Sequence, residues 1–333
     1  MPRRYSRRST RPMEDSPSLF DNADKDENVL FKVVASDKNR EKSTIEEYAV
    51  AEEFVRRPRG LRFMSFGSGS SGNCSYIGTP TCGILIDGGV DNNFVTSELA
   101  RAGIDISTIK GIFLTHDHAD HVRYSYALVR RNPHMRLYAT ARTIDGVLRR
   151  HNISRRIKDY HTPIYKEHEY VFDGMKVIPF ETSHDGTDNC GFAISLDGMS
   201  FVIATDMGSI TERADYYMRR ANALVIESNY DDQMLTEGRY TEHLKARIRS
   251  NTGHMENSVT ARYLTDIFTR NLSHIFLCHL SEDNNTPETA LATSLNALRT
   301  IEIRPAASSA EIPKNMVYIT TLPRYKSSEL YVF

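Results

Sequence analysis

The sequence predicts an α/β sandwich, in which two β-sheets pack face to face and helices cover their outer sides. Short apolar runs typical of strands come first, and strands then alternate with helical patterns, twice over. The 333 residues suffice for one large domain or two small ones. Hydrophobic residues at 40% and charged residues at 26% are typical of a soluble globular protein.

The chain is expected to divide into a tail and one folded domain. Residues 1–58 run from a basic, Ser-rich arm into an acidic, Asn-rich stretch without sustained apolar patterning, which predicts a disordered tail. The basic arm lacks the apolar segment of a secretory signal, and no run is long enough to span a bilayer. Residues 59–333 are expected to form the domain.

The four cysteines indicate a reducing compartment. They are Cys74, Cys82, Cys190 and Cys278, and no pair forms C-x-x-C. So few cysteines in a chain of this length do not make a disulfide framework, and buried thiols are the simpler interpretation. We therefore expect a cytoplasmic protein without a membrane partner.

Alternating apolar residues, turn signals and helix caps place the elements in order. Strands are expected at 61–66, 74–77, 83–86, 109–114, 170–180 (around a turn at 173–174), 190–196, 200–205, 223–226, 274–278 and 316–321. Helices are expected at 93–102, 122–131, 140–151, 211–220, 241–250, 258–270 and 287–298. The helix at 258 is expected to have Asn257 or Ser258 as its N-cap, and the helix at 287 has proline at its first position.

The densest polar cluster follows the apolar run 112–114. Residues 115–121, Thr-His-Asp-His-Ala-Asp-His, contain three histidines and two aspartates. Imidazole and carboxylate are the usual ligands of Zn, Mn and Fe(II). A buried strand face cannot hold so many polar groups, so they must cluster on the turn that leaves the strand. A loop of ordinary surface histidines is the less favoured alternative.

Four further polar residues each follow an apolar strand-like run. They are Asp87, His184, Asp206 and His279. Strand ends at one edge of a sandwich can converge on rigid supports. Together with the histidine cluster, these residues provide enough ligands for two divalent ions, Mn or Zn with Fe as an alternative. One site would take His116, His118 and His184, the other Asp120, His121 and His279, and Asp206 would bridge them. Nothing in the pattern requires Asp117.

A basic window follows the histidine cluster. Between residues 123 and 158 there are ten Lys and Arg residues and one acid, Asp145, although the net charge of the chain is only −1. Such a window could bind nucleic acid or could be a solvated helical face, and both interpretations are kept. The glycine-rich stretch 67–73 lacks the Gly-Lys-Ser/Thr ending of a Walker loop, and its small residues allow close backbone approach or a plain hairpin.

The order Asp, H-x-H-x-D-H, His, Asp, His resembles the five motifs of the metallo-β-lactamase superfamily. Four flanking stretches, 66–73, 205–208, 253–257 and 279–285, resemble its YycJ (WalJ) branch over residues 61–300. The resemblance implies a four-layer αββα sandwich, with metal roles for His116, His118, Asp120, His121, His184, Asp206 and His279. It makes Asp87 a supporting residue. The chain departs from the branch at Tyr230, where relatives often have His, and at Met255-Glu256, where they often have Leu-Ser.

The resemblance implies a metal-dependent exonuclease acting on double-stranded DNA. Two divalent ions would activate a water for attack on the phosphodiester. Asp120 and Asp206 are the expected proton acceptors, and His254 is the candidate proton donor or phosphate clamp, with a structural histidine as the alternative. Ser70, Asn73, His254 and Asn257 are the expected substrate contacts. The rival functions are a small-molecule hydrolase for a thioester, lactone or cyclic phosphodiester, and a binding module without catalysis.

Overall fold

The computed structural model describes residues 60–333, and the tail predicted at 1–58 lies outside the described residues. The described part contains two sheets. The first has the strand order β15 (Tyr331–Val332), β1 (Arg62–Gly67), β2 (Cys74–Gly78), β3 (Gly83–Ile86), β4 (Ile109–Phe113), β5 (Arg136–Ala139), β6 (His161–Pro163). The second has the order β13 (Arg304–Pro305), β14 (Met316–Thr321), β12 (His274–Cys278), β11 (Ala223–Glu227), β10 (Met199–Ala204), β9 (Cys190–Leu196), β8 (Met175–Glu181), β7 (Tyr170–Phe172).

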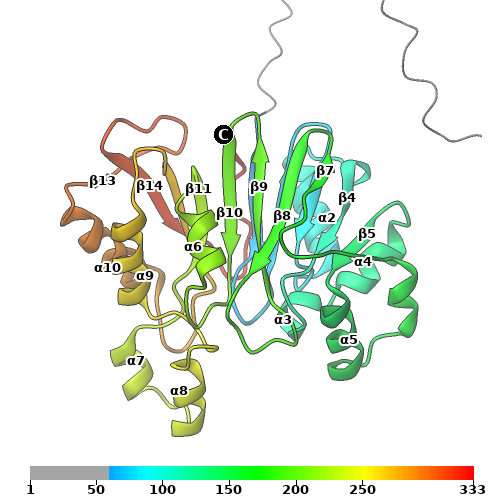
Figure 1. Cartoon of the computed structure of the whole chain (residues 1–333), viewed down its shortest axis with the longest axis horizontal. Helices are drawn as coiled ribbons and strands as arrows, with labels where there is room; N and C mark the ends of the chain where they lie inside the picture. Colours follow the sequence, from blue (N-terminus) through cyan, green and yellow to red (C-terminus); the bar gives the residue numbers. More distant parts are fainter. Residues whose placement is uncertain (1–59) are drawn as a thin grey trace, which may run out of the picture. The chain divides into compact units, whose positions relative to one another are not determined.

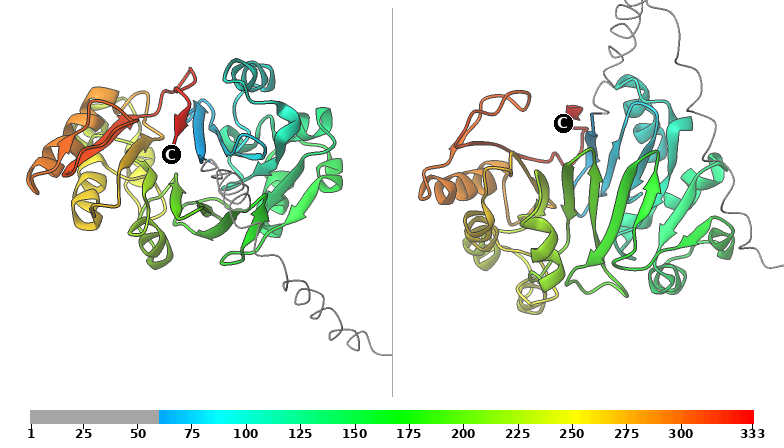
Figure 2. Two further views of the ribbon diagram at one scale, coloured as in Figure 1. Left: turned by 90° about the horizontal axis from the view of Figure 1, so that it is seen from above. Right: turned by 45° about the horizontal axis from the view of Figure 1, so that its top comes forward.

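Helices cover the outer side of each sheet, which completes the predicted four-layer sandwich (Figures 1 and 2). The first sheet packs against α2 (Asn92–Arg101), α4 (Ser125–Arg131) and α5 (Ala141–Arg150), and α3 (Ala119–Val122) follows β4. The second packs against α6 (Glu212–Met218), α9 (Asn257–Ile267) and α10 (Pro287–Arg299). Two short helices, α7 (Asp232–Glu237) and α8 (Glu242–Ile248), follow β11. Among the described residues, no helix is long and apolar enough to cross a membrane.

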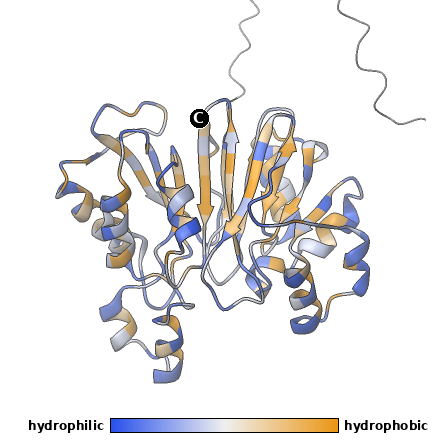
Figure 3. Cartoon of the chain, in the orientation of Figure 1, coloured by the Kyte–Doolittle hydropathy of each residue, from blue (hydrophilic) through white to orange (hydrophobic). Residues whose placement is uncertain are grey.

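Residue alternation along the strands explains the layers. In β1, Phe63 points into the core between the sheets, whereas its neighbour Met64 packs with the helices. Across the sheets the Phe63 ring lies 4.8 Å from the ring of Phe201 and 5.1 Å from that of Phe276. Each fully buried side chain of this size stabilises the fold by about 2 kcal/mol. Figure 3 shows the resulting contrast between apolar strands and polar outer helix surfaces.

The site-bearing strand ends share one edge because the strands that carry them are largely parallel. Strands β3 and β4 are parallel in the first sheet, and β10, β11 and β12 are parallel in the second. Carboxyl ends of parallel strands meet at the same edge, where α/β proteins commonly bind ligands. The polar side chains predicted at five strand ends therefore lie in one region of the molecule.

The elements that the sequence did not predict are short or depend on distant partners. They are β5, β6, β13, β15, α3 and α7, together with two 3₁₀ helices at Ile106–Thr108 and Arg155–Asp159. The predicted N-cap of α9 was wrong by one residue, because the carboxylate of Glu256 accepts the backbone N–H of Val259, which makes Glu256 the cap. Asn257 is instead the first helical residue, and it is fully buried.

Gly89 is required by a close backbone approach. A Cβ at this position would lie 1.6 Å from the carbonyl oxygen of Asp120. The backbone N–H of Gly89 donates to the carbonyl of Asn73 (2.9 Å), and that of Asn73 donates to the carbonyl of Asp120 (2.8 Å). The loop after β3, the glycine-rich stretch and α3 are thereby held together.

Replacing Gly89 with Ala is therefore expected to lower the free energy of unfolding by about 3 kcal/mol, because backbone atoms would have to move. Gly103→Ala is the matched control. Gly103 has φ +71° but no atom within 4 Å of a Cβ, so only conformational strain of about 1 kcal/mol is expected. Urea denaturation measures both. Equal losses in the two variants would contradict the close-packing argument.

Candidate metal centre

Five chain segments deliver the predicted ligands and the supporting residue Asp87. Asp87 follows β3, His184 follows β8, Asp206 follows β10 and His279 follows β12. After β4 come His116 and His118, and then Asp120 and His121 within α3. Three of these residues have left-handed backbone conformations: Asp87 with φ 62°, Asp206 with φ 52° and His279 with φ 53°. Residues other than glycine rarely adopt this conformation, and such residues cluster at functional sites. Here the turn ends each strand abruptly and places the side chain at the edge of the sheet.

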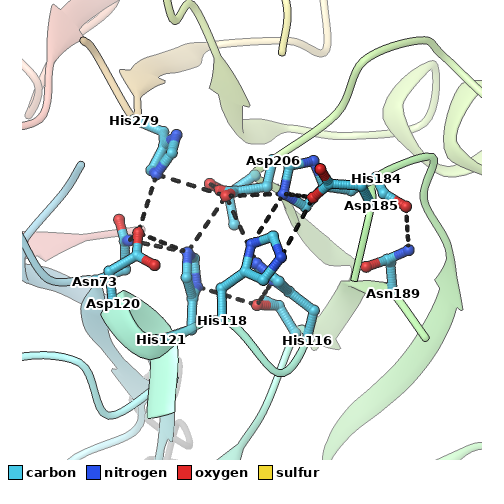
Figure 4. A network of polar contacts seen from close by, with 12 residues as sticks. Asn73, His116, His118, Asp120, His121, His184, Asp185, Asn189, Asp206 and His279 are labelled. Atoms are coloured by element: carbon cyan, nitrogen blue, oxygen red, sulfur yellow. Dashed lines mark hydrogen bonds and ion pairs between the residues drawn. The ribbon is translucent and has the colours of Figure 1, made fainter. Parts of the chain in front are cut away.

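Asp206 lies at the centre of the cluster (Figure 4). Its Oδ2 atom is 3.4 Å from His121 Nε2 and 3.5 Å from His279 Nε2, on one side. It is 3.7 Å from both His116 Nε2 and His184 Nε2, on the other. One carboxylate oxygen thus faces four imidazole nitrogens, an arrangement suited to a carboxylate shared between two cations.

The remaining predicted ligands fall into the two expected groups. The nitrogens of His116, His118 and His184 lie within 4.8 Å of one another, and so do the ligand atoms of Asp120, His121 and His279. In the second group Asp120 Oδ2 is 3.6 Å from His121 Nε2 and 3.5 Å from His279 Nε2. The structure therefore brings together all seven residues predicted to bind metal.

Each of the five histidines has a polar neighbour at the nitrogen that points away from the cluster, and in all but His118 the contact is a hydrogen bond. The outer contacts are His121 Nδ1 with Asp87 Oδ2 (2.7 Å), His279 Nδ1 with Glu227 Oε1 (3.1 Å), His184 Nδ1 with the carbonyl of Gly253 (2.9 Å), His116 Nδ1 with Thr115 Oγ1 (3.0 Å) and His118 Nε2 with Asp185 Oδ1 (3.2 Å). Such outer partners fix the tautomer and orientation of metal-binding histidines. The inner nitrogens are thus aimed at a common space.

The donor set fits divalent cations. His116 Nε2 and His279 Nε2 are buried and have no hydrogen-bond partner. A buried nitrogen left without a partner is costly, and one cation in each ligand group would satisfy them. The mixture of imidazole nitrogens and carboxylate oxygens suits Zn, Mn or Fe and does not select among them.

The protonation states also fit cation binding. Burial lowers the pKa of His116 well below its usual value, and burial with the neighbouring His184 lowers that of His118 to about 4, so both are neutral ligands at physiological pH. Burial would raise the pKa of Asp206, but His279 and His121 hold it well below its usual value. Burial opposes the charged form of His279, yet Asp206, Asp120 and Glu227 raise its pKa to about 10. A cation bound there would replace that proton.

Glu227, at the end of β11, links the centre to His254. Its side chain is fully buried, and its Oε1 lies 2.7 Å from His254 Nδ1 and 3.1 Å from His279 Nδ1. Its Oε2 accepts the backbone N–H groups of Met207 (2.7 Å) and Met255 (3.2 Å). One carboxylate thus orients both a predicted ligand and the predicted proton donor. The ring of His254 lies 4.9 Å from that of His184 and keeps some solvent exposure.

The residues expected to contact substrate differ in their location and in their solvent exposure. Asn73 lies inside the centre, with its Nδ2 2.9 Å from His121 Nε2 and 3.3 Å from Asp120 Oδ2. Ser70 is exposed, and its hydroxyl accepts a hydrogen bond from Arg324 (3.2 Å). Asn257 is not at the surface of the site. Its amide is fully buried, and its Oδ1 accepts a hydrogen bond from the hydroxyl of Ser228 (2.7 Å), so a substrate cannot reach it.

The two departures from the branch pattern are structural. Tyr230 is buried and packs with Leu235 and Ile248 beneath the short helices after β11. Met255 belongs to the core that the second sheet shares with its helices, and Glu256 caps α9. Neither therefore lines an open pocket.

Sequence reasoning missed three supporting residues: Thr115, Asp185 and Glu227. Thr115 and Asp185 are sequence neighbours of predicted ligands, a signal that was available. Asp117 is not part of the cluster, as expected, because its carboxylate accepts the backbone N–H of Thr187 (3.0 Å) and pairs with Arg150 (3.2 Å).

The basic window begins at the rim of the centre. Arg150, at the end of α5, contacts Asp117 in the loop that carries the ligands, and Arg149 approaches the hydroxyl of Thr187 (3.4 Å). Nine of the ten basic residues are exposed, and Arg136 is half-buried. Lys158 pairs with Asp145 (3.2 Å), the acid within the window. The part of the window next to the metal centre is therefore the C-terminal half of α5.

Fold and centre together define a metal-dependent hydrolase. Residues 83–275 match the family model described as the beta-lactamase superfamily domain, and the chain belongs to that superfamily. The metallo-beta-lactamase fold protein YhfI from Bacillus subtilis has a similar structure, with a TM-score of 0.57 and 13% identity over 82% of this chain and all of that one.

Within the superfamily the chain belongs to the YycJ-type branch. It is 33% identical to the protein named exodeoxyribonuclease YycJ of Bacillus anthracis, over 69% of this chain and 86% of that protein. It is 29% identical to exodeoxyribonuclease WalJ of Streptococcus pneumoniae, over 72% of this chain and 88% of the relative.

Proposed function

We propose that this protein is a metal-dependent exonuclease that degrades double-stranded DNA from its ends, with two divalent ions at the centre. The proposal rests chiefly on the position of Asp206 Oδ2 between two groups of ligands, 3.4 to 3.7 Å from four imidazole nitrogens. The names of the two relatives support DNA as the substrate. We extend the proposal to a reducing, cytoplasmic setting, which agrees with four cysteines that are all buried and unpaired.

Divalent ions at this centre would polarise a phosphodiester and activate a water for attack on phosphorus. Asp206 is fully enclosed, whereas the side chain of Asp120 is 18% exposed, so Asp120 is the carboxylate that can accept a proton from an entering water. Asn73 lies within hydrogen-bonding distance of Asp120 Oδ2 and orients it.

His254 is the proposed proton donor to the leaving oxygen. The Glu227 carboxylate accepts the Nδ1–H of His254, which fixes the ring and leaves Nε2 to hold and release a proton. His254 is also close to the centre, because one of its nitrogens lies within 4.8 Å of ligand atoms of Asp206 and His279. It therefore has the geometry of a general acid rather than of a buried structural histidine.

Arg149 and Arg150 are the proposed backbone contacts. Both are exposed at the end of α5 beside the ligand loop, and guanidinium groups bind phosphates without reading sequence. This position argues against the small-molecule alternative, which would leave the basic window turned away from the centre.

His118→Ala tests the proposal. The variant removes one ligand of the first group, and manganese-stimulated degradation of an end-labelled duplex is expected to fall at least about a hundredfold. The measurement is a panel of duplex DNA, single-stranded DNA and RNA, each with Mn, Zn and Fe. His168→Ala, in the exposed turn before β7, is the matched control and should retain full activity. Metal-loaded wild-type protein that leaves every nucleic acid intact would refute the function.

A further inference from the structure

A groove with a cavity volume of about 550 Å³ lies between the loop that follows β12 and the C-terminal strap, which we define as residues 322–328. Its lining includes Ser68, Leu280, Glu282, Pro323 and Tyr325. This volume falls within the range of small-ligand sites. The proposed chemistry has so far used no residue of the strap.

The groove adjoins the backbone of the predicted ligand His279. Ser68, at one end of the groove, accepts a hydrogen bond from the backbone N–H of His279 (2.8 Å). Leu280 is the residue next to His279 and also lines the groove. A ligand in the groove therefore lies beside the proposed metal ligand His279.

The strap is anchored so that an aromatic ring stays at the surface. The guanidinium of Arg324 donates to the hydroxyl of Ser70 (3.2 Å) and to the carbonyl of Leu280. The hydroxyl of Tyr325 donates to Glu282 Oε1 (2.8 Å), across the groove. Tyr325 nevertheless remains 66% exposed, more than any other large hydrophobic side chain in residues 60–333. An immobilised but exposed ring is suited to stacking on a flat partner.

The lining of the groove suits a nucleotide. Leu280, Pro323 and the ring of Tyr325 offer an apolar, partly aromatic surface, which suits a nucleobase. Arg324 and Lys326 also line the groove, alongside the acidic Glu282, and can pair with the phosphate next to that base. An enzyme that removes nucleotides from an end must hold the terminal nucleotide beside its metal centre.

We propose that this groove is a subsite for the terminal nucleobase of the strand being cut, which stacks on Tyr325. This inference rests on the proposed exonuclease function and adds the residue that recognises the strand end. Because every base has a flat face, the subsite accepts all four bases and imposes no sequence preference.

The test combines a protein change with a substrate change. Tyr325→Ala in the full, metal-loaded chain is expected to raise the KM for an end-labelled duplex about tenfold, with kcat changed less than about threefold. Tyr325→Phe should stay within about threefold of wild type, because it keeps the ring. Wild-type protein should have a KM about tenfold higher for a duplex whose terminal nucleotide lacks its base. Tyr325→Ala should show no further rise in KM with this duplex, because the change in the protein and the change in the DNA remove the same contact.

Tyr165→Ala is the matched control, because Tyr165 is 62% exposed and lies away from the strap, after β6. It should behave like wild type on both duplexes. The metal content of each purified variant, measured by elemental analysis, should equal that of wild type and reports an intact metal centre. Two results would overturn the base subsite without affecting the proposed exonuclease function. One is an unchanged KM in Tyr325→Ala, and the other is KM increases from the protein change and the missing base that multiply when combined. Wild-type protein that does not degrade DNA would overturn both.

Discussion

Asp206→Asn is expected to reduce kcat on duplex DNA by about a thousandfold. Asn is nearly the same size and, like Asp, tolerates the left-handed backbone that position 206 requires, with φ 52°. The substitution therefore removes the negative charge between the two ligand groups and leaves the turn intact. We also expect the metal content to fall below that of wild type, because the shared oxygen is lost. Steady-state kinetics and elemental analysis measure the two effects.

Asp197→Asn is the matched control for this variant. Asp197 also has a left-handed conformation, with φ 48°, but it lies in the exposed turn between β9 and β10. Its thermal stability, metal content and activity should equal those of wild type. An Asp206→Asn enzyme that retained full metal content and more than a tenth of the wild-type rate would show that Asp206 does not bridge two cations.

His254→Ala is expected to lower kcat on DNA by about a hundredfold or more, the usual contribution of a general acid. Its effect should depend on the leaving group. Departure of a sugar alkoxide needs a proton, whereas nitrophenolate is a stable anion and does not. The variant should therefore cleave bis(p-nitrophenyl) phosphate at a rate within about threefold of wild type.

Glu227→Gln should lower activity on both substrates, because Glu227 orients the predicted ligand His279 as well as His254. Its amide cannot accept the N–H groups of His254, His279 and two backbone positions at once, so the ring of His254 loses its orientation. Because Glu227 is fully buried, folding of this variant must be checked by circular dichroism.

For His254→Ala, equal losses of activity on DNA and on bis(p-nitrophenyl) phosphate would assign His254 a structural role.

Local signals explain why the ligands could be predicted from sequence. Each predicted ligand segment directly follows an apolar run that forms a strand, as Asp206 follows β10 and His279 follows β12. The H-x-H-x-D-H stretch adds four ligand positions within six residues. Strand patterning therefore predicted both the sandwich and the edge at which the ligands meet.

The contacts of Glu227 with His254 and His279 could be recognised only from the tertiary structure. Glu227 lies 27 residues from His254 and 52 from His279, so no spacing in the sequence relates them. Strands β5 and β6 have four and three residues. They form because β4 offers β5 a parallel partner and β5 in turn offers one to β6, rather than because of their own patterning. The strap reaches the glycine-rich stretch across 254 residues, through Arg324 and Ser70. Contacts of this kind arise only on folding.

The central claim is that this centre removes nucleotides from DNA ends. The most direct measurement compares a linear duplex with the same DNA as a covalently closed circle, both incubated with manganese-loaded wild-type protein. The account predicts that the linear duplex is degraded progressively from its ends, that the circle persists, and that chelation of the metal stops the reaction. Degradation of the circle at the rate of the linear form, or an intact linear duplex, would contradict it.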